Sequence, residues 1–300
     1  MTILLILLVI TIFAYLSLNI YINHIIDTYI QTNQTKHLKS LGVDENKFIG
    51  LHKKELSLPN AYMIYARKTT AYKGVILFTP DQNLSYRFYM PLINFLCRQG
   101  YIITTYQQEH IFYSKSVEDY QKLYDCVTND EILGTYPLSC LGHGSGALVQ
   151  VSTPLEKVIN YICFQPKTLE LNEILKNTKI KNEKVINKLI KTIEKKYETN
   201  IQLTPRPNEY TYVIYGDQDQ NATLTIDNTS VKVLSGLGRY PFLNIDSEQH
   251  IRSLECLLEF PDTPQFEYNK AIENFETNTL YDLNAEVLEI LPYLFETKTQ

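Results

Sequence analysis

A glycine-dense corner at residues 142–146 (Gly-His-Gly-Ser-Gly) holds the side chains best suited to chemistry. A serine hydroxyl there would be a nucleophile only if a neighbouring base took its proton. An apolar run enters the corner at residues 138–141, and an apolar helical start leaves it at residues 147–149. Strand, sharp turn and helix form the setting of a G-x-S-x-G nucleophile elbow. The stretch therefore predicts an elbow.

The spacing within this corner leaves the nucleophile position without a side chain. Gly142 and Gly146 take the two flanking glycine positions of the pattern, so its centre falls on Gly144. Ser145 comes one residue too late, since His143 and Ala147 stand two residues to either side of it. The sequence therefore indicates an elbow that has lost its nucleophile.

The elements around the corner predict an α/β fold with a mainly parallel sheet covered by helices on both faces. Apolar runs with flanking turn signals indicate strands, and apolar residues at helical spacing indicate helices. Because the two alternate along the chain, right-handed crossovers are expected. The expected strands are residues 48–56, 61–66, 74–79, 101–106, 138–141, 158–164, 210–215 and 231–234, and the expected helices are 89–98, 117–128 and 247–260.

The first residues predict a single-pass membrane anchor. Residues 3–22 contain no charged side chain, and about 20 apolar residues suffice to cross a bilayer as a helix. A cleaved signal peptide is the alternative, but no Lys or Arg precedes Lys36 and no small-residue cleavage site follows the run. Lys36 and Lys39 favour the cytoplasm as the side of the following domain. We expect an anchor at residues 1–26 and a polar stalk at 27–47.

Composition narrows the function classes. The net charge of −5 argues against a general nucleic-acid binder, and 44% hydrophobic residues suffice for a sizeable core. The five cysteines are an odd number without a C-x-x-C pair, which indicates reduced core residues and fits a reducing compartment. No cluster of His, Cys or Asp has metal-ligand spacing, so neither a metal nor another cofactor is expected.

Two further segments complete the chain. An insertion at about residues 167–209 carries an amphipathic stretch at 182–197, with eight lysines and two glutamates between residues 176 and 196. It is interpreted as a solvated helix face or, alternatively, as a basic face towards an anionic membrane surface. The tail at residues 261–300 is acidic, and residues 280–295 are expected to dock as a helix that bends or stops near Pro292.

Four co-linear motifs resemble those of the α/β-hydrolase superfamily over about residues 48–260. GVILFT (74–79) with residues 89–106 is similar to the strand, helix and strand ahead of the elbow. LGHGSGALVQ (141–150) resembles the elbow itself. YVIYGDQDQNAT (212–223) resembles the turn that delivers the catalytic acid, and LSGLGRYPFL (234–243) resembles the loop that delivers the histidine. The insertion lies where the family carries its cap.

The resemblance implies a degenerate catalytic triad. Gly144 stands at the position of the serine, and Arg239 stands at the position of the histidine. Asp219 takes the position of the acid, with Asp217 as an alternative. The loop after the first buried strand, residues 79–82, lacks the glycines expected of an oxyanion loop. Arginine stays protonated and cannot act as a general base, so loss of both groups indicates loss of the catalytic unit.

Other residues could supply part of the chemistry. Ser145 is interpreted as a helix cap, with a shifted nucleophile as the alternative. His143 is expected to be a packing residue and His250 a residue of the protein surface. His110 follows the second buried strand in a loop and is a weaker candidate for reaching the site.

These observations predict a membrane-anchored pseudo-hydrolase that acts as a binding or scaffold module. Arg239 is expected to form an ion pair with Asp219, or to join Gly144 and Ser145 in a site for an anionic small molecule or a lipid head group. The alternative is an active esterase, lipase or peptidase-like hydrolase in which Ser145 acts with Asp219. A third interpretation is a structural membrane partner bound through the basic insertion or the acidic tail, with the partner protein unknown.

Overall fold

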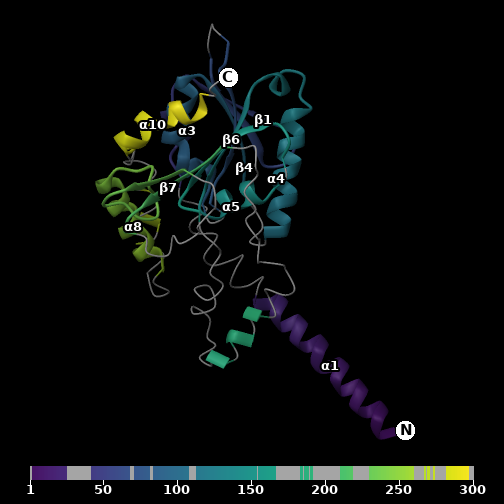
Figure 1. The fold of residues 1–300 in the computed structure, drawn as a ribbon. Coiled ribbons are helices and arrows are strands. Elements are labelled where there is room, and N and C mark those ends of the chain that lie inside the picture. Colours follow the sequence, from purple (N-terminus) through teal and green to yellow (C-terminus); the bar gives the residue numbers. More distant parts are fainter. Residues whose placement is uncertain are drawn as a thin grey trace.

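The computed structural model shows one domain preceded by a long helix (Figure 1). The described residues are 2–25, 42–67, 71–81, 84–107, 113–153, 155–166, 183–184, 186–188, 190–191, 210–218, 230–259, 267, 269–270, 273 and 282–296.

The described strands form a single eight-stranded sheet with the order β1-β2-β4-β3-β5-β6-β7-β8. β1 pairs antiparallel with β2 and β2 antiparallel with β4, whereas the other neighbours pair in parallel. The carboxyl ends of the parallel strands therefore meet at one edge. The strands are β1 (Leu51–Glu55), β2 (Ala61–Ala66), β3 (Gly74–Thr79), β4 (Tyr101–Tyr106), β5 (Leu138–His143), β6 (Val158–Phe164), β7 (Tyr210–Gly216) and β8 (Ser230–Leu234).

Helices cover both faces of this sheet, as the sequence predicts. The α-helices are α1 (Thr2–Ile25), α3 (Met90–Gln99), α4 (Tyr113–Thr128), α5 (Ser145–Ser152), α8 (Ile245–Glu259) and α10 (Ala285–Phe295), and the short 3-10 helices are η2 (Glu45–Lys47), η3 (Tyr86–Tyr89) and η4 (Leu133–Thr135). α3, α8 and α10 pack on one face and α4 and α5 on the other.

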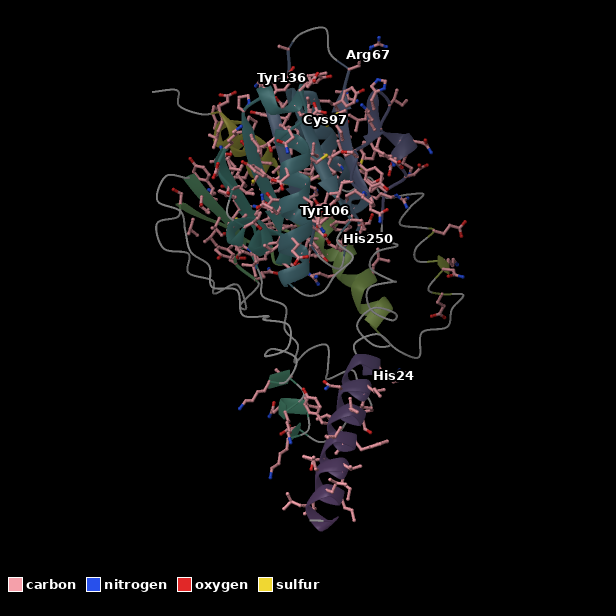
Figure 2. The ribbon with its side chains drawn as sticks, turned by 90° about the vertical axis from the view of Figure 1, so that its right-hand side faces the viewer. His24, Arg67, Cys97, Tyr106, Tyr136 and His250 are labelled. Carbon is pink, nitrogen blue, oxygen red and sulfur yellow. The ribbon has the colours of Figure 1, made fainter. Side chains whose placement is uncertain are left out.

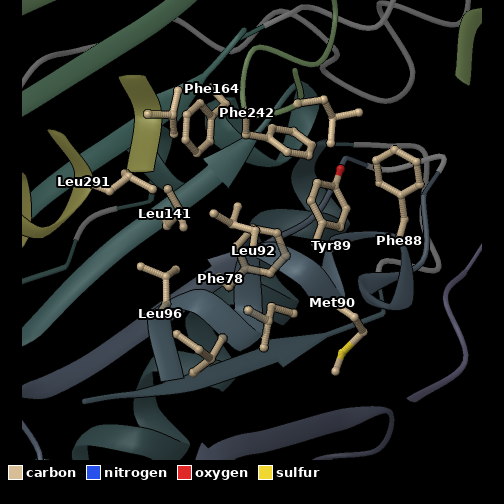
Figure 3. Packing of buried hydrophobic residues seen from close by; sticks show 14 of the residues in the cluster. Phe78, Phe88, Tyr89, Met90, Leu92, Leu96, Leu141, Phe164, Phe242 and Leu291 are labelled. Atoms are coloured by element: carbon tan, nitrogen blue, oxygen red, sulfur yellow. The ribbon is translucent and has the colours of Figure 1, made fainter. Parts of the chain in front are cut away.

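The alternation of side chains in β3 explains why both faces are apolar. Ile76 and Phe78 belong to the cluster beneath α3, α8 and α10, whereas Val75 and Leu77 belong to the cluster beneath α4 and α5. Successive residues of a strand point to opposite faces, so a central strand buried on both faces needs a continuous apolar run. Figure 3 shows the first cluster, in which Phe78 lies near Tyr89 and α3.

Most element boundaries agree with the sequence-based expectation to within a few residues. α3 ends where predicted, because Gly100 caps it with a φ of 102°. The first strand is shorter than residues 48–56, since Phe48 caps a 3-10 turn and β1 begins at Leu51. α10 begins at Ala285, capped by Asn284, and continues past Pro292 to Phe295 rather than stopping at the proline.

Chain segments on both sides of residues 48–260 join the domain core. Val43 is fully buried, and its amide donates to the Arg87 carbonyl. Val287, Leu291 and Phe295 of α10 are buried in the cluster that also contains α3. The packed unit therefore includes the end of the expected stalk and the last helix of the expected tail.

α1 is long and apolar enough to cross a membrane. Its span Leu4–Tyr21 has a mean hydropathy of 2.3, and none of it is buried against the domain. A signal sequence near an N-terminus meets the same criteria, so the helix has two interpretations.

Several expectations concern residues outside the described part of the chain. Asp219, His110 and most of the insertion at residues 167–209 lie there. The described residues of the insertion's amphipathic stretch are helical, and Ile190 among them is buried.

Candidate functional site

The elbow at Gly144 has the sharp geometry that the motif predicts. Gly144 connects β5 to α5 with φ 55° and ψ −125°, a backbone conformation that favours glycine. Its amide donates to the Phe164 carbonyl at the end of β6, at 2.9 Å. The turn therefore stands at the carboxyl edge of the sheet, between the ends of β3 and β6.

Close packing at Gly146 brings the loop after β3 against this turn. A Cβ atom on Gly146 would lie only 2.5 Å from the Thr79 carbonyl oxygen and would also collide with that of Pro80. Only glycine lets α5 begin this near to the end of β3. The next residue of that loop, Asp81, is thereby brought to the elbow.

The Asp81 carboxylate is the centre of the site. Its Oδ1 accepts hydrogen bonds from the Ser145 hydroxyl at 2.7 Å and from the Ser145 amide at 3.3 Å. Its Oδ2 accepts one from Arg239 Nη2 at 2.9 Å. Asp81 is 6% exposed, and a charge at such a depth needs partners of this kind.

This carboxylate occupies the space into which a nucleophile's side chain would extend. A Cβ atom placed on Gly144 would lie 2.7 Å from Asp81 Cγ, 2.8 Å from Oδ2 and 3.0 Å from Oδ1. Because Cγ is the nearest of the three atoms, the carboxylate presents its flat face to Gly144. A serine at position 144 would therefore require Asp81 to move.

The surroundings of Asp81 keep it ionised. Burial alone would raise its pKa, but the charge of Arg239, the electrostatic effect of His143 and the hydrogen bonds from Ser145 and Arg239 outweigh burial and lower the pKa to about 2. Asp81 is therefore a carboxylate at neutral pH and a weak base.

His143 is a buried packing residue, as expected, and both of its ring nitrogens have partners. Nε2 lies 2.7 Å from the Arg239 carbonyl oxygen, which only accepts, so Nε2 carries a hydrogen. Nδ1 lies 2.8 Å from the Tyr89 hydroxyl. The oxygen of that hydroxyl accepts a hydrogen bond from the Asp81 amide at 3.0 Å. Phe242 packs edge-on against the imidazole. His143 thus links the Asp81 backbone to the Arg239 backbone.

A second buried carboxylate, Glu248 of α8, shapes the Arg239 loop (residues 235–241). Glu248 is 2% exposed and accepts from the Gly238 amide at 2.8 and 2.9 Å and from the Tyr240 amide at 3.2 Å. These amides flank Arg239, so the carboxylate stabilises the loop backbone from which the Arg239 side chain extends. Arg252 pairs with Glu248 at 3.0 Å.

The resemblance assigns oxyanion stabilisation to two backbone donors, and this chain uses them differently. The Ser145 amide, at the position after the nucleophile, donates to Asp81. In the loop after β3, Pro80 has no N–H, and the Asp81 amide donates to Tyr89. Residues 82 and 83 lie in one of the gaps of the described chain.

The expected ion pair of Arg239 has a different partner among the described residues. Arg239 pairs with Asp81, whereas Asp219 is not described. Asp217 holds a turn, because its Oδ1 accepts from the Gly236 amide at 2.7 Å. His250 is an exposed residue of α8, as expected (Figure 2).

The expectation that Ser145 caps a helix is wrong. The N-cap position of α5 belongs to Gly144, and no side chain caps this helix. Ser145 is the first helical residue, and its hydroxyl donates to Asp81 instead because the loop after β3 places a carboxylate 2.7 Å away.

Sequence reasoning missed the roles of Asp81, Glu248 and Tyr89. Asp81 was visible as a charged residue in a loop that should be rich in glycine, which was a usable signal. Glu248 lies in the first turn of an amphipathic helix, where acidic residues are common, and nothing in its local sequence shows that it is buried. Tyr89 reads as one of many aromatic core residues.

The described residues show no metal centre and no disulfide. Within the described ranges, no group of three His, Cys, Asp or Glu side chains is arranged to hold a metal ion. Cys97, Cys126, Cys140 and Cys163, four cysteines of this part of the chain, are free thiols.

Comparison with known proteins supports the fold. No protein-family model matches the sequence, and no curated protein matches it. Similar solved structures include the esterase EstE5 soaked with p-nitrophenyl butyrate, with a TM-score of 0.50 and 10% identity over 80% of this chain and 88% of that chain. An esterase of the bacterial hormone-sensitive lipase family has a TM-score of 0.47 and 14% identity, covering 81% of this chain and 88% of its own.

A thermostable carboxyl esterase from Bacillus coagulans is similar at a TM-score of 0.45 and 13% identity, over 75% of this chain and 99% of that chain. At these identities the likeness concerns the fold. Together with the sheet and the elbow, it shows that the chain has an α/β-hydrolase-like fold.

Proposed function

We propose that this chain is a membrane-anchored pseudo-hydrolase that binds or scaffolds partner molecules rather than hydrolysing them. The observation that carries the proposal is the position of Asp81. Its Cγ lies 2.7 Å from the point where a Cβ atom of residue 144 would stand, so a carboxylate of the chain itself fills the nucleophile's place.

The chemistry of the neighbouring groups supports the same conclusion. A general base works best when its pKa lies near the operating pH. The groups around Asp81 hold its pKa at about 2, so it has little tendency to take the proton of the Ser145 hydroxyl that it accepts. Arg239 cannot act as a base, and His143 Nε2 already donates to a carbonyl oxygen. None of these three neighbouring groups is therefore suited to activate Ser145.

The alternative function is an active ester hydrolase that uses Ser145. Two observations favour it. The similar solved structure of EstE5 was soaked with an ester, p-nitrophenyl butyrate. Ser145 is a buried serine beside the elbow, and its hydroxyl already donates to a carboxylate 2.7 Å away. This function would require an activating base from outside the described residues, such as Asp219 or His110 with a rearranged elbow.

Ester turnover and covalent labelling separate the two functions. The full chain in detergent is given p-nitrophenyl butyrate and a fluorophosphonate probe, beside Ser145→Ala and Ser152→Ala, which changes the last residue of the same helix. The proposal predicts no turnover above buffer and no label on any of the three. Labelling that is lost in Ser145→Ala and kept in Ser152→Ala would establish the alternative.

The membrane part of the proposal rests on α1. Its uncharged span supports a retained anchor, and the following lysines Lys36 and Lys39 support a cytoplasmic domain. Carbonate extraction of membranes from expressing cells tests the anchor. Retention of the full-length chain in the pellet is the expected result, and a soluble chain that has lost its first residues would identify a cleaved signal.

The ligand part of the proposal is an anionic small molecule or lipid head group at Gly144, Ser145 and Arg239. The Ser145 amide and the Arg239 guanidinium are suitable donors for an anion. Since Asp81 lies among these groups, an external anion binds there only when Asp81 gives way.

A further inference from the structure

The groups around Asp81 contact its two oxygens separately. Oδ1 accepts hydrogen bonds from the hydroxyl and the amide of Ser145, and Oδ2 accepts one from the guanidinium of Arg239. These donors come from α5 and from the Arg239 loop, which are distant from Asp81 in sequence. If the Asp81 side chain were taken away, the donors would still be positioned by their own elements.

Groups other than Asp81 hold the backbone of each donor residue. Ser145 begins α5, which follows directly from the central strand β5. The amides on either side of Arg239 are bound by Glu248, and the Arg239 carbonyl is bound by His143. The positive end of the α5 dipole and one arginine charge therefore face the same point. These groups are suited to bind an anion in the place of the Asp81 carboxylate.

The shape of the site favours a planar carboxylate. The Asp81 carboxylate lies with its flat face towards Gly144, because a Cβ atom there would meet Cγ, Oδ2 and Oδ1 at 2.7, 2.8 and 3.0 Å. A tetrahedral phosphate has no flat face to place against the elbow. A phosphate also carries more charge than the single described cation, Arg239, that pairs with the site.

We propose that Asp81 is a tethered ligand and that the donors around it form a carboxylate-binding site, which takes a free small monocarboxylate once the Asp81 side chain is absent. This inference rests on the proposed function and names the ligand class of its site. In the native chain the tethered group acts at an effective concentration on the order of millimolar or higher, so free acids compete poorly with it.

Chemical rescue of Asp81→Ala tests the inference. The full chain in detergent is melted in sodium acetate, in sodium chloride and in sodium phosphate at equal ionic strength and pH 7. Acetate at several times its Kd is expected to raise the Tm of Asp81→Ala by about 2–4 °C over chloride. The Tm of the native chain is expected to be the same in acetate and chloride.

Two matched variants identify the site. Asp81→Asn keeps the volume of the side chain filled, and the double variant Asp81→Ala/Arg239→Met removes the cation. Neither is expected to respond to acetate. If Asp81→Ala does not fold in chloride, the same comparison is made on refolding yield from urea, where acetate is expected to raise the yield of Asp81→Ala and not that of the double variant.

Three results would overturn the inference. They are no effect of acetate on Asp81→Ala by either readout, an equal effect on Asp81→Asn or the double variant, and an equal or larger effect of phosphate on Asp81→Ala. Failure here is distinct from failure of the proposed function, because fluorophosphonate labelling that depends on Ser145 would remove the pseudo-hydrolase proposal whatever acetate does.

Discussion

Asp81 and Glu248 are two buried carboxylates that hold the same loop in different ways. Glu248 accepts from two backbone amides, those of Gly238 and Tyr240, and pairs with the half-exposed Arg252. Asp81 accepts from side chains, the Ser145 hydroxyl and the Arg239 guanidinium, with one longer contact to the Ser145 amide. Glu248 therefore binds the loop backbone, whereas Asp81 binds the side chain that the loop presents.

This difference in partners indicates different roles: Glu248 stabilises the fold of the loop, whereas Asp81 lies in the candidate site. Glu248 supplies a buried acceptor to the backbone amides on both sides of Arg239, so it stabilises the conformation of the loop. The donors around Asp81 are kept in place by other elements and surround the space in front of Gly144. In our proposal Asp81 is an occupant of the site, whereas Glu248 is part of the structure that surrounds it.

The largest predicted effect is that of Glu248→Ala. It removes the buried acceptor that the Gly238 and Tyr240 amides share, and we expect a loss of about 4 kcal/mol in the free energy of unfolding. Urea unfolding of the full chain measures it. Glu286→Ala, which removes a carboxylate that is 51% exposed and pairs with the exposed Lys232, is the control and is expected to cost less than about 1 kcal/mol. Equal costs for the two variants would contradict the assignment of Glu248.

Arg239→Met is expected to cost about 3 kcal/mol, somewhat less than Glu248→Ala. It leaves the Asp81 carboxylate buried without its cation, and an unpaired buried charge is strongly destabilising. Arg98→Met is the matched control, since Arg98 is exposed and donates to the Asn94 side chain and the Ile49 carbonyl rather than to a buried carboxylate. If the two variants unfolded at the same urea concentration, the Asp81–Arg239 pair would not be a significant source of stability.

Acidification gives the next effect, of about 2 kcal/mol. The pKa of Asp81 in the folded chain is lowered to about 2, below its unfolded value of about 4. The stabilisation from this shift is complete above pH 4 and is lost as pH falls from about 4 to about 2. Asp81→Asn lacks this component, so its unfolding free energy should fall less over that window. Parallel losses in the native chain and in Asp81→Asn would refute the ionic role of Asp81.

Much of the fold could be predicted from the sequence because local patterns determine it. The apolar runs at β3, β4 and β6 have the length and composition of strands buried on both faces, and Gly100 marks the end of α3. The elbow needs a positive φ at Gly144 and close packing at Gly146, and glycine is the residue that suits both. The strand–turn–helix geometry was therefore also predictable.

The position of Asp81 in the site could not be predicted, because it depends on contacts between segments that are distant in the sequence. Asp81 and Ser145 are 64 residues apart, and they meet because α5 begins against the end of β3. The predicted pair of Arg239 with Asp219 stays a prediction, and the carboxylate that pairs with Arg239 among the described residues is Asp81, in the loop after β3. Glu248 was unrecognisable for the same reason, since its burial depends on the loop that it binds.

The most direct measurement of the central claim, that Asp81 fills the nucleophile's place, is a double-mutant cycle between Gly144→Ala and Asp81→Ala. Urea unfolding free energies of the four full-length proteins give the coupling. In the native chain the new Cβ atom meets the Asp81 carboxylate at 2.7 Å and adds strain at a φ of 55°, whereas in Asp81→Ala only the backbone strain remains. We predict that Gly144→Ala lowers the free energy of unfolding by at least about 1 kcal/mol less in the Asp81→Ala background than in the native chain. Costs equal within about 0.5 kcal/mol would show that the space in front of Gly144 is not filled by Asp81.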